Sequence, residues 1–403
     1  MADTVLDSPR RLAGLRRRLL GWYDAHRRDL PWRRDRDPYR IWVSEVMLQQ
    51  TQVATVKPYF ERFMAAFPTL ADLATADLDA VLRHWAGLGY YRRARHLHAA
   101  AIELHRQYAG TLPDDPDVWR RLPGVGRYIL GAVLSQAFDR RLPIVEANTI
   151  RVLTRLLGER GDPATNAVQR RLWHAAETLL PTKRVGDFNQ ALMELGSLVC
   201  TIERPACQQC PLARDCLAHR HGAQDQIPQR SPPPPLVAVS EVAVVVQRQD
   251  RVLLVQRPPT AKRWAQLWEF PHDPIQPGES SEAAAVRLVE AMTGLRIAAA
   301  QPWTTIRHQV TRHAITMQVL RADWVAGEFV AGTAYAAGRW LRADELGQFA
   351  LSSPQRRLAR LLQSSQLSLF AVQEDADDST QTNANDSTQA NADDSAQANA
   401  AEV

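Results

Sequence analysis

The stretch Leu122-Pro-Gly-Val-Gly-Arg-Tyr128 joins two segments that favour helices, and it decides how the first half of the chain folds. Gly124 and Gly126 have no Cβ, so the backbone can turn tightly between the two helices. The free amides of this turn and of the next helix can then point at a phosphate, with Arg127 beside them. A plain connection between antiparallel helices would also account for Gly-x-Gly, so the neighbouring sequence has to decide.

Residues 8–221 around this stretch have the pattern of a helical domain. Amphipathic runs such as 94–108 and 168–180 alternate with short connections that contain proline or glycine. Beyond them, Pro228 and the four prolines of 232–235 fit neither a helix nor a central strand. We therefore expect an all-α domain over 8–221 and a stiff linker over 222–236.

The pattern changes beyond the linker. Four runs rich in β-branched or aromatic residues predict strands: 237–246, 252–255, 315–320 and 324–330. The pair Gln249-Asp250 between the first two is typical of a hairpin. One helix is expected between the second and third, from Ser280 or Ser281 as N-cap to Gly294 at its C-terminus. Residues 237–363 therefore predict an α+β domain, which makes the chain a multidomain protein.

Residues 364–403 differ in composition from both domains. Three octads, DDSTQTNA, NDSTQANA and DDSAQANA, occupy 377–400 and contain no apolar residue larger than alanine. Such a segment cannot bury enough apolar surface to fold, so we expect a disordered acidic tail. At its start, Gln366-Leu367-Ser368-Leu369-Phe370 resembles the motif that binds the bacterial sliding clamp as an extended peptide. Packing of these residues against the last helix is the alternative.

Charge is distributed unevenly over the 403 residues. The net charge is +5, but residues 371–403 carry eight acids and no Lys or Arg, so residues 1–370 carry +13. All but three of the 49 cationic side chains are arginines, whose guanidinium groups suit bidentate contacts with phosphate. This charge permits a nucleic-acid partner, although a compositional bias toward arginine would produce it as well.

Several classes of protein are excluded. No window holds 18 consecutive apolar residues, and residues 1–20 carry arginines without an apolar core, so we expect no membrane span and no secretory signal. Four cysteines in a chain of this length are too few for a disulfide scaffold. We expect a cytoplasmic, nucleoid-associated protein that acts as a monomer.

The four cysteines form one pattern, Cys200-x6-Cys207-x2-Cys210-x5-Cys216. Four thiolates on one short loop can close a tetrahedral site. Zinc is one candidate, although Cys₄ zinc sites usually consist of two C-x2-C pairs. The spacing resembles that of the iron-sulfur loop in helix-hairpin-helix DNA glycosylases related to endonuclease III and MutY, and this resemblance implies a 4Fe-4S cluster.

Residues 39–53 form another informative stretch, Tyr-Arg-Ile-Trp-Val-Ser-Glu-Val-Met-Leu-Gln-Gln-Thr-Gln-Val. A helix capped at Ser44 would place Glu45, Gln49 and Gln52 on one face, because residues four and seven positions apart are neighbours on a helix. An isolated glutamate in a first helical turn usually only interacts favourably with the helix dipole.

This stretch, with Leu30-Pro-Trp-Arg33 before it, closely resembles the signature of the MutY family of adenine DNA glycosylases. The resemblance implies that Glu45 is the catalytic acid, that Gln49 enters the DNA base stack and that Arg33 helps to position the site. Gln50, another candidate DNA contact, falls among the apolar residues of the predicted helix and would need buried partners.

Two further stretches extend the resemblance. In Gly87-Leu-Gly-Tyr-Tyr-Arg-Arg-Ala-Arg95, Tyr90 matches the residue that enters the stack beside the mispaired guanine, whereas Tyr91 suits a protein core. Tyr128 stands where related enzymes that also cut the strand carry a lysine nucleophile, so β-lyase chemistry lacks its amine.

One stretch departs from the family pattern. The family has Asp-Gly-Asn where this chain has Glu146-Ala147-Asn148, and its aspartate opposes the positive charge on the sugar. A helix start at this point would help to keep Glu146 ionised. Because Glu146 is one methylene longer than aspartate, either the loop has moved back or activity is reduced. Asn148 matches a supporting position.

The second domain resembles a Nudix domain. Glu279 and Arg287 fit the Nudix box, but Ala291 and Met292 replace the acids that hold magnesium, so the cation has no site. The resemblance extends to the MutT-like domain of MutY, which binds 8-oxoguanine. Where that family has Phe-Ser-His this chain has Val310-Thr311-Arg312, followed by His313; Thr311 keeps a hydroxyl for the damaged base.

Taken together, the motifs predict a monofunctional DNA glycosylase that removes adenine mispaired with 8-oxoguanine or guanine in double-stranded DNA. Two alternatives remain: a glycosylase and lyase of the endonuclease III type that acts on oxidised pyrimidines, and a catalytically impaired protein that only binds the mismatch. A Nudix hydrolase is disfavoured because the acids of the box are missing.

Overall fold

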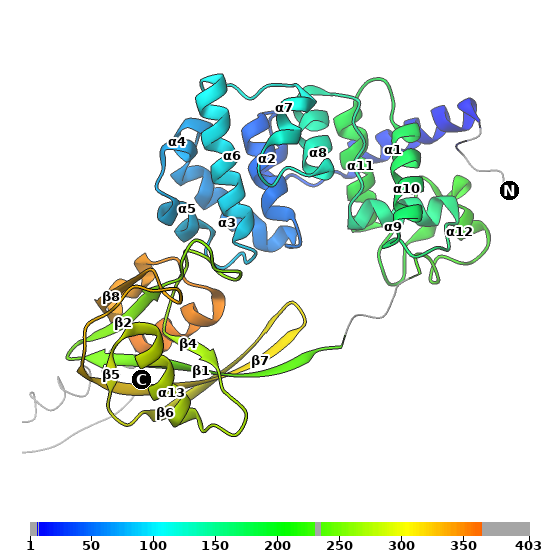
Figure 1. The fold of residues 1–403 in the computed structure, drawn as a ribbon. Helices are drawn as coiled ribbons and strands as arrows, with labels where there is room; N and C mark the ends of the chain where they lie inside the picture. The colour runs from blue at the N-terminus through cyan, green and yellow to red at the C-terminus, as the bar shows by residue number, and fades with distance from the viewer. Residues whose placement is uncertain (1–5, 7, 230–234, 365–403) are drawn as a thin grey trace, which may run out of the picture.

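The computed structural model describes residues 6, 8–229 and 235–364. Its first long stretch folds into helices joined by short connections (Figure 1). The helices are α1 (Pro9–His26), α2 (Pro38–Leu48), α3 (Val53–Ala66), α4 (Leu70–Thr75), α5 (Leu78–Trp85), α6 (Arg92–Tyr108), α7 (Pro116–Arg121), α8 (Arg127–Phe138), α9 (Ala147–Leu157), α10 (Asn166–Leu179), α11 (Val185–Leu198) and α12 (Leu217–Arg220). The predicted all-α domain is therefore confirmed.

These helices pack around two hydrophobic cores. The first lies among α2 to α8, where Trp42 and Trp119 meet edge to face with ring centroids 5.4 Å apart. The second lies among α1 and α9 to α11, and the loop of the four cysteines packs against it. Helices α8 and α11 contact each other where the two halves meet (Figure 1). Because α2 belongs to one half and α9 to the other, Glu45 and Glu146 come from opposite sides of this seam.

The boundaries of α2 correct one prediction. The helix begins at Pro38 with Asp37 as N-cap, because proline suits the first helical position and the Asp37 carboxylate accepts the Tyr39 N–H at 2.8 Å. Ser44, the predicted cap, is a buried residue inside the helix, and its hydroxyl donates to the Ile41 carbonyl. The helix ends at Leu48, so the predicted face that joins Glu45, Gln49 and Gln52 does not exist.

The second domain is a mixed sheet between two helices. Its strands are β1 (Val237–Arg248), β2 (Arg251–Gln256), β3 (Trp268–Glu269), β4 (His272–Pro274), β5 (Arg296–Ile297), β6 (Gln301–Val310), β7 (His313–Ala326) and β8 (Ala337–Arg342). The central order is β3-β2-β1-β7-β5, with β1 and β7 parallel and the other pairs antiparallel. The predicted α+β class is confirmed.

Alternation along β1 explains the two layers. Val242, Val244 and Val246 face α13 (Ser281–Thr293), whereas Ala243 and Val245 face a core with the helix of residues 353–364. The hairpin of β6 and β7 closes where Val310 pairs with His313, and its tip projects toward the helical domain (Figure 1).

The strand and helix predictions of this domain had mixed outcomes. Helix α13 is confirmed, with the Ser280 hydroxyl as cap and Gly294 in the left-handed conformation at its end. The predicted separate strand at 324–330 is wrong, because β7 runs on to Ala326 and Gly327 then turns at φ +91°. β6 was missed although four of its ten residues are β-branched, because Pro302 and the polar run Arg307-His308-Gln309 interrupt the apolar pattern.

The two domains touch directly. Tyr91 Oη, at the start of α6, donates to the Leu351 carbonyl at 3.0 Å, and Arg95 Nη1 donates to the Ala265 carbonyl at 2.7 Å. The proposed linker over 222–236 joins α12 to β1, and its residues 230–234 lie outside the described residues, as do residues 366–370 and the acidic octads. No described helix is both long and apolar enough to cross a membrane.

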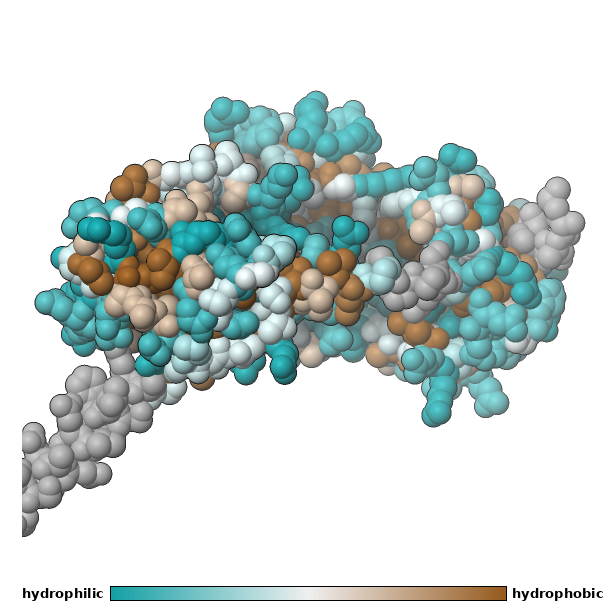
Figure 2. Space-filling model, turned by 60° about the horizontal axis from the view of Figure 1, so that its bottom comes forward, coloured by the Kyte–Doolittle hydropathy of each residue, from teal (hydrophilic) through white to brown (hydrophobic). Residues whose placement is uncertain are grey.

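Figure 2 shows a face on which hydrophilic residues predominate and hydrophobic residues gather in small separate patches. The large exposed hydrophobic side chains include Leu236 at the end of the linker and Val325 and Val330 in the second domain. Scattered apolar side chains of this kind are normal on a protein surface and point to no particular partner.

Candidate active site

Glu45 lies in the last turns of α2 and is only 2% exposed. Its two oxygens accept hydrogen bonds from Tyr128 Oη at 2.5 Å and from Gln136 Nε2 at 2.8 Å. Burial raises the pKa of Glu45 above its ordinary value, although these two donors and the charge of Arg33 lower it in part. This carboxyl therefore holds a proton at a higher pH than a surface glutamate does.

Both donors come from α8, which begins directly after the Gly124-Val-Gly126 turn. Gly124 has φ +75°, and a Cβ there would lie 2.6 Å from the Cβ of His96, so only glycine fits. Gly126 is extended and is the N-cap of α8. Sequence reasoning missed Gln136; the available signal was a polar pair, Ser135-Gln136, inside an otherwise apolar helix.

Glu146 is the N-cap of α9, and it is held by its own helix. The backbone N–H groups of Asn148 and Thr149 each donate to one of its carboxylate oxygens at 2.9 Å. The expectation that the helix start keeps Glu146 ionised needs correction. Burial raises the pKa of this carboxyl and the charge of Glu45 adds to the rise, while the two amide donors oppose it.

Asn148 connects Glu146 to the loop of the cysteines. Its Nδ2 donates to Glu146 Oε2 at 3.2 Å, and its Oδ1 accepts from Arg151 Nη2 at 2.9 Å. Arg151 in turn donates to the Cys200 carbonyl at 2.6 Å. One turn further along α9, Arg155 Nη1 donates to Cys200 Sγ at 3.3 Å. A single face of α9 therefore holds both the carboxylate and the cysteine loop.

The four cysteines are partly buried and form no disulfide. Burial raises the pKa of the Cys207, Cys210 and Cys216 thiols, that of Cys210 to about 12, and the charges of neighbouring thiolates add to the rise. In the described residues no three His, Cys, Asp or Glu side chains are arranged for a single metal ion, and this includes the cysteines. The four thiols are nevertheless close enough to interact electrostatically, so the donor set suits a group that several thiolates share.

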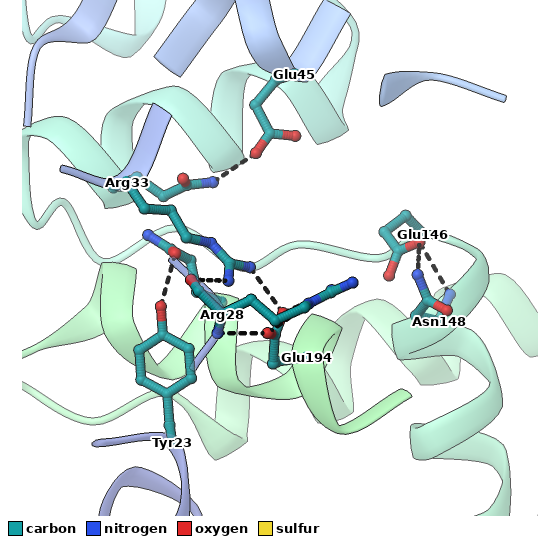
Figure 3. A network of polar contacts seen from close by, with 9 residues as sticks. Tyr23, Arg28, Arg33, Glu45, Glu146, Asn148 and Glu194 are labelled. Carbon is teal, nitrogen blue, oxygen red and sulfur yellow. Dashed lines mark hydrogen bonds and ion pairs between the residues drawn. The ribbon is translucent and has the colours of Figure 1, made fainter. Parts of the chain in front are cut away.

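Arg33 lies between Glu45 and a third buried carboxylate, Glu194 (Figure 3). Its Nη2 donates to Glu194 Oε2 at 2.9 Å, and Arg28 donates to the same buried carboxylate at 2.7 and 2.8 Å. Burial alone would raise the pKa of Glu194, but the two guanidinium groups lower it to about 2. Glu194 thus fixes Arg33 in a position from which its charge acts on Glu45.

A cavity of about 990 Å³ opens between the two domains beside these groups. From the helical domain it is lined by Tyr128 and Glu146, so the catalytic candidates lie on its wall, and Glu45 lies directly behind Tyr128. The other predicted residues on its wall are Gln49, Gln50, Tyr90, Gly124 and Thr311. Predicted residues that are not on its wall are Arg33, Gly126, Arg127, Asn148, Arg312 and His313.

Gln50 and Arg127 differ from expectation. Gln50 is exposed at φ +58° in the turn after α2, so it needs no buried partners. It lies there because α2 ends at Leu48, before the apolar arc of the predicted helix would reach it. Arg127 places its guanidinium 3.8 Å above the ring centroid of Trp173, a cation–π contact, instead of beside the cavity.

Tyr90 stands in the cavity with 54% of its surface exposed and φ +49°. The guanidinium carbon of Arg93 lies 5.4 Å from the Tyr90 ring centroid, a cation–π contact. Arg93 also donates to the carbonyls of Val46 and Met47 at 2.9 and 2.8 Å. Tyr91 is buried, which confirms its expected place in the core.

The second domain contributes the hairpin tip. Thr311 has φ +51° and its hydroxyl donates to the Val310 carbonyl at 2.7 Å. The Nudix box keeps its Glu279–Arg287 pair, with two hydrogen bonds of 2.6 and 2.8 Å. At the positions of the metal-binding acids, Ala291 and Met292 offer no oxygen ligand.

Comparison with known proteins agrees with this geometry. Residues 43–178 match the HhH-GPD superfamily of base excision DNA repair proteins, and residues 241–361 match the NUDIX domain. The adenine DNA glycosylase of Rattus norvegicus is 36% identical over 87% of this chain and 78% of its own length. That of Homo sapiens is 35% identical over 86% and 74%, and that of Buchnera aphidicola from Schizaphis graminum is 34% identical over 63% and 73%. Because the first two likenesses cover most of this chain and about three quarters of each relative, the chain belongs to the adenine DNA glycosylase family of base excision repair proteins.

Proposed function

We propose that the protein removes adenine from double-stranded DNA in which the adenine is mispaired with 8-oxoguanine or guanine, and that it does not cut the strand. The observation that carries this proposal is the buried carboxyl of Glu45 behind the cavity wall, with a raised pKa and with two hydrogen bonds that fix its direction. Adenine is a poor leaving group unless it is protonated, so a buried acid is the group this reaction needs.

In this proposal the flipped adenine enters the cavity and displaces the Tyr128 hydroxyl from Glu45, which transfers its proton to N7 of the base. The bond between the base and the sugar then breaks, and positive charge develops on the sugar. Glu146, at the same wall and within electrostatic reach of Glu45, stabilises that charge as a second carboxylate does in glycoside hydrolysis. Glu45, now ionised, accepts a proton from the water that attacks the sugar.

The supporting residues have separate roles. Arg33 and Asn148 orient the surroundings of the two carboxylates, while Tyr128 orients Glu45 and supplies no amine for strand cleavage. Gln49, Gln50 and Tyr90 face the DNA stack from the cavity wall, and Gly124, Gly126 and Arg127 belong to the turn proposed to face a phosphate. Thr311, Arg312 and His313 belong to the hairpin proposed to face the damaged guanine.

We further propose that Cys200, Cys207, Cys210 and Cys216 hold a 4Fe-4S cluster, whose thiolate bonds would fix the loop. The four-thiol donor set and the arginines of α9 that bind the loop support this role. Ultraviolet–visible absorption together with iron and sulfide analysis of the purified protein tests it, and a protein that carries zinc without iron would contradict it.

The experiment that tests the activity is single-turnover adenine release by the full chain. Duplexes with adenine opposite 8-oxoguanine, guanine and thymine are compared, and the first two should release adenine while the third should not. Borohydride trapping on an abasic duplex serves as the test of the lyase alternative, and a trapped covalent complex would exclude a monofunctional enzyme. A protein that binds the mismatches but releases no adenine would favour the impaired alternative.

The sliding clamp remains a proposed partner on the grounds of sequence alone. Deletion of residues 366–370 should abolish co-elution with the clamp, whereas unchanged co-elution would exclude this motif as the contact.

A further inference from the structure

The loop of residues 257–267, which joins β2 to β3, projects into the cavity from the second domain. Its residues Lys262, Arg263 and Trp264 line the cavity, as do Gln49 and Tyr90 of the helical domain. Lys262 and Arg263 are both exposed. The Arg263 guanidinium contacts a ring nitrogen, with its Nη2 3.2 Å from His313 Nδ1. The loop therefore presents two cations to the cavity.

The shape of the loop is held by its own backbone and by the helical domain. The Gln266 N–H donates to the Arg257 carbonyl at 3.1 Å, and the Arg257 N–H donates to the Leu267 carbonyl at 3.0 Å. Arg95 on α6 donates to the Ala265 carbonyl at 2.7 Å. Trp264 and Gln266 have φ of +53° and +64°. Residues other than glycine adopt this left-handed conformation only where the surroundings impose it. A strained backbone held at both ends fixes the direction of residues 262 and 263.

At the base of the loop, cationic and anionic side chains pair with one another. Arg257 forms an ion pair with buried Glu269 at 2.8 Å, and His272 lies 3.3 Å from both Glu241 and Glu269. Burial lowers the pKa of His272, but the two carboxylates outweigh it and raise the pKa to about 9. Two cations thus face two anions beneath Trp264, whose ring centroid is 5.9 Å from that of His272. The charges of Lys262 and Arg263 are not needed to balance this group.

We propose that Lys262 and Arg263 bind the phosphate backbone of a DNA strand in the cavity, on the strand that carries the purine opposite the adenine. Arg263 contacts His313, beside the Thr311 hairpin proposed to face that purine, which places both cations on this strand's side. A guanidinium and an ammonium on a fixed loop offer one bidentate and one point contact to successive phosphates. This inference rests on the proposed DNA substrate and adds a contact that the sequence motifs do not contain.

The test uses the full chain with Lys262→Ala and Arg263→Ala together. Its dissociation constant for a duplex with 8-oxoguanine opposite a 2′-fluorinated adenosine that resists release is measured over a series of salt concentrations. Loss of two phosphate contacts should lower the slope of log Kd against log salt by about 1.8. A matched variant, Arg296→Ala with Arg360→Ala, removes the same charge at exposed residues away from the cavity and should leave the slope nearly unchanged. Equal slopes for the two double variants would overturn the proposal.

Neutral methylphosphonates then identify the strand. Placed beside the 8-oxoguanine, they should weaken binding of the wild-type chain and remove its advantage over the Lys262→Ala/Arg263→Ala variant. Placed in the adenine strand, they should leave that advantage intact, and the opposite pattern would refute the assignment. These are binding measurements, so they stand even if single-turnover assays show that the wild-type chain releases no adenine, an outcome that would contradict the proposed function alone.

Discussion

The two carboxylates of the site are both buried glutamates, yet they are held in different ways. Glu45 receives its hydrogen bonds from side chains of another helix, Tyr128 and Gln136, whereas Glu146 receives its two shortest from the backbone amides at the start of its own helix. Burial raises the pKa of both. Side-chain donors allow the proton affinity of Glu45 to be adjusted residue by residue, whereas the amides position Glu146 whatever the neighbouring side chains are.

Replacement of the proton donor should have the largest effect. Glu45→Gln keeps the shape of the side chain but removes the acid, so single-turnover adenine release should fall by about 10²- to 10⁴-fold. Binding of the mismatch should persist, because residues proposed to face the DNA from the cavity wall, such as Gln49 and Tyr90, are unchanged. Release at a wild-type rate would show that another group protonates the base.

Replacement of Glu146 should have the next largest effect. Glu146→Gln removes the charge that opposes the developing positive charge on the sugar, so release should fall by about 10²-fold. The matched control is Glu146→Asp, which keeps both the charge and the ability to cap α9. If Glu146→Asp releases adenine much faster than the wild-type chain, the longer side chain impairs the site and the binding-protein alternative gains support.

Tyr128→Phe should change the pH dependence of adenine release. The Tyr128 hydroxyl donates to the Glu45 carboxylate and lowers its pKa, so its loss should raise that pKa. Release requires protonated Glu45 and declines as pH rises through this pKa, so the alkaline limb of the pH profile should move to higher pH. Gln136→Leu removes the other donor and should move the limb in the same direction; a downward shift in either variant would contradict the assignment of Glu45 as the acid.

The smallest expected effect is on stability. The pKa of Glu45 is higher in the folded state than in the unfolded state. Its contribution to the free energy of unfolding is therefore fully present below the pKa of the unfolded state and is lost as pH rises through the pKa of the folded state. Above that pH the ionised carboxylate destabilises the fold, so Glu45→Gln should increase the free energy of unfolding. Denaturant unfolding of wild type and variant at pH 5 and pH 8 measures this gain, which should be larger at pH 8. Glu194→Gln is the contrasting control and should destabilise at both pH values, because the pKa of Glu194 is lowered to about 2 by its two arginines.

Local pattern was sufficient for several features. Ser280 and Gly294 bracket α13 as predicted, because capping depends on residues within a few positions of the helix end. The family motifs led to Glu45, Tyr128 and the four cysteines. The wrong face for Gln49 and Gln52 arose because hydrophobic spacing continues past Leu48, where the helix stops.

Partners distant in the chain could not be predicted. Gln136 is 91 positions from Glu45, and Glu194 is 161 positions from Arg33. No periodic pattern connects such residues, since their contact depends on how α8 and α11 pack against the rest of the helical domain. The same applies to the loop at 257–267, whose cations enter the cavity only because the second domain docks on α6.

By itself the sequence determined the two domains, the family and the glycine turn, and it singled out Glu45 as the candidate acid, because these depend on residue type and on spacing over a few turns of chain. Only the tertiary structure decided which groups hold the carboxylates of Glu45 and Glu146 and that the pKa of each is raised. Burial and the charges that oppose it come from helices that the chain brings together across the seam between α2 and α9, and electrostatic energy depends on distance through space and on access of water.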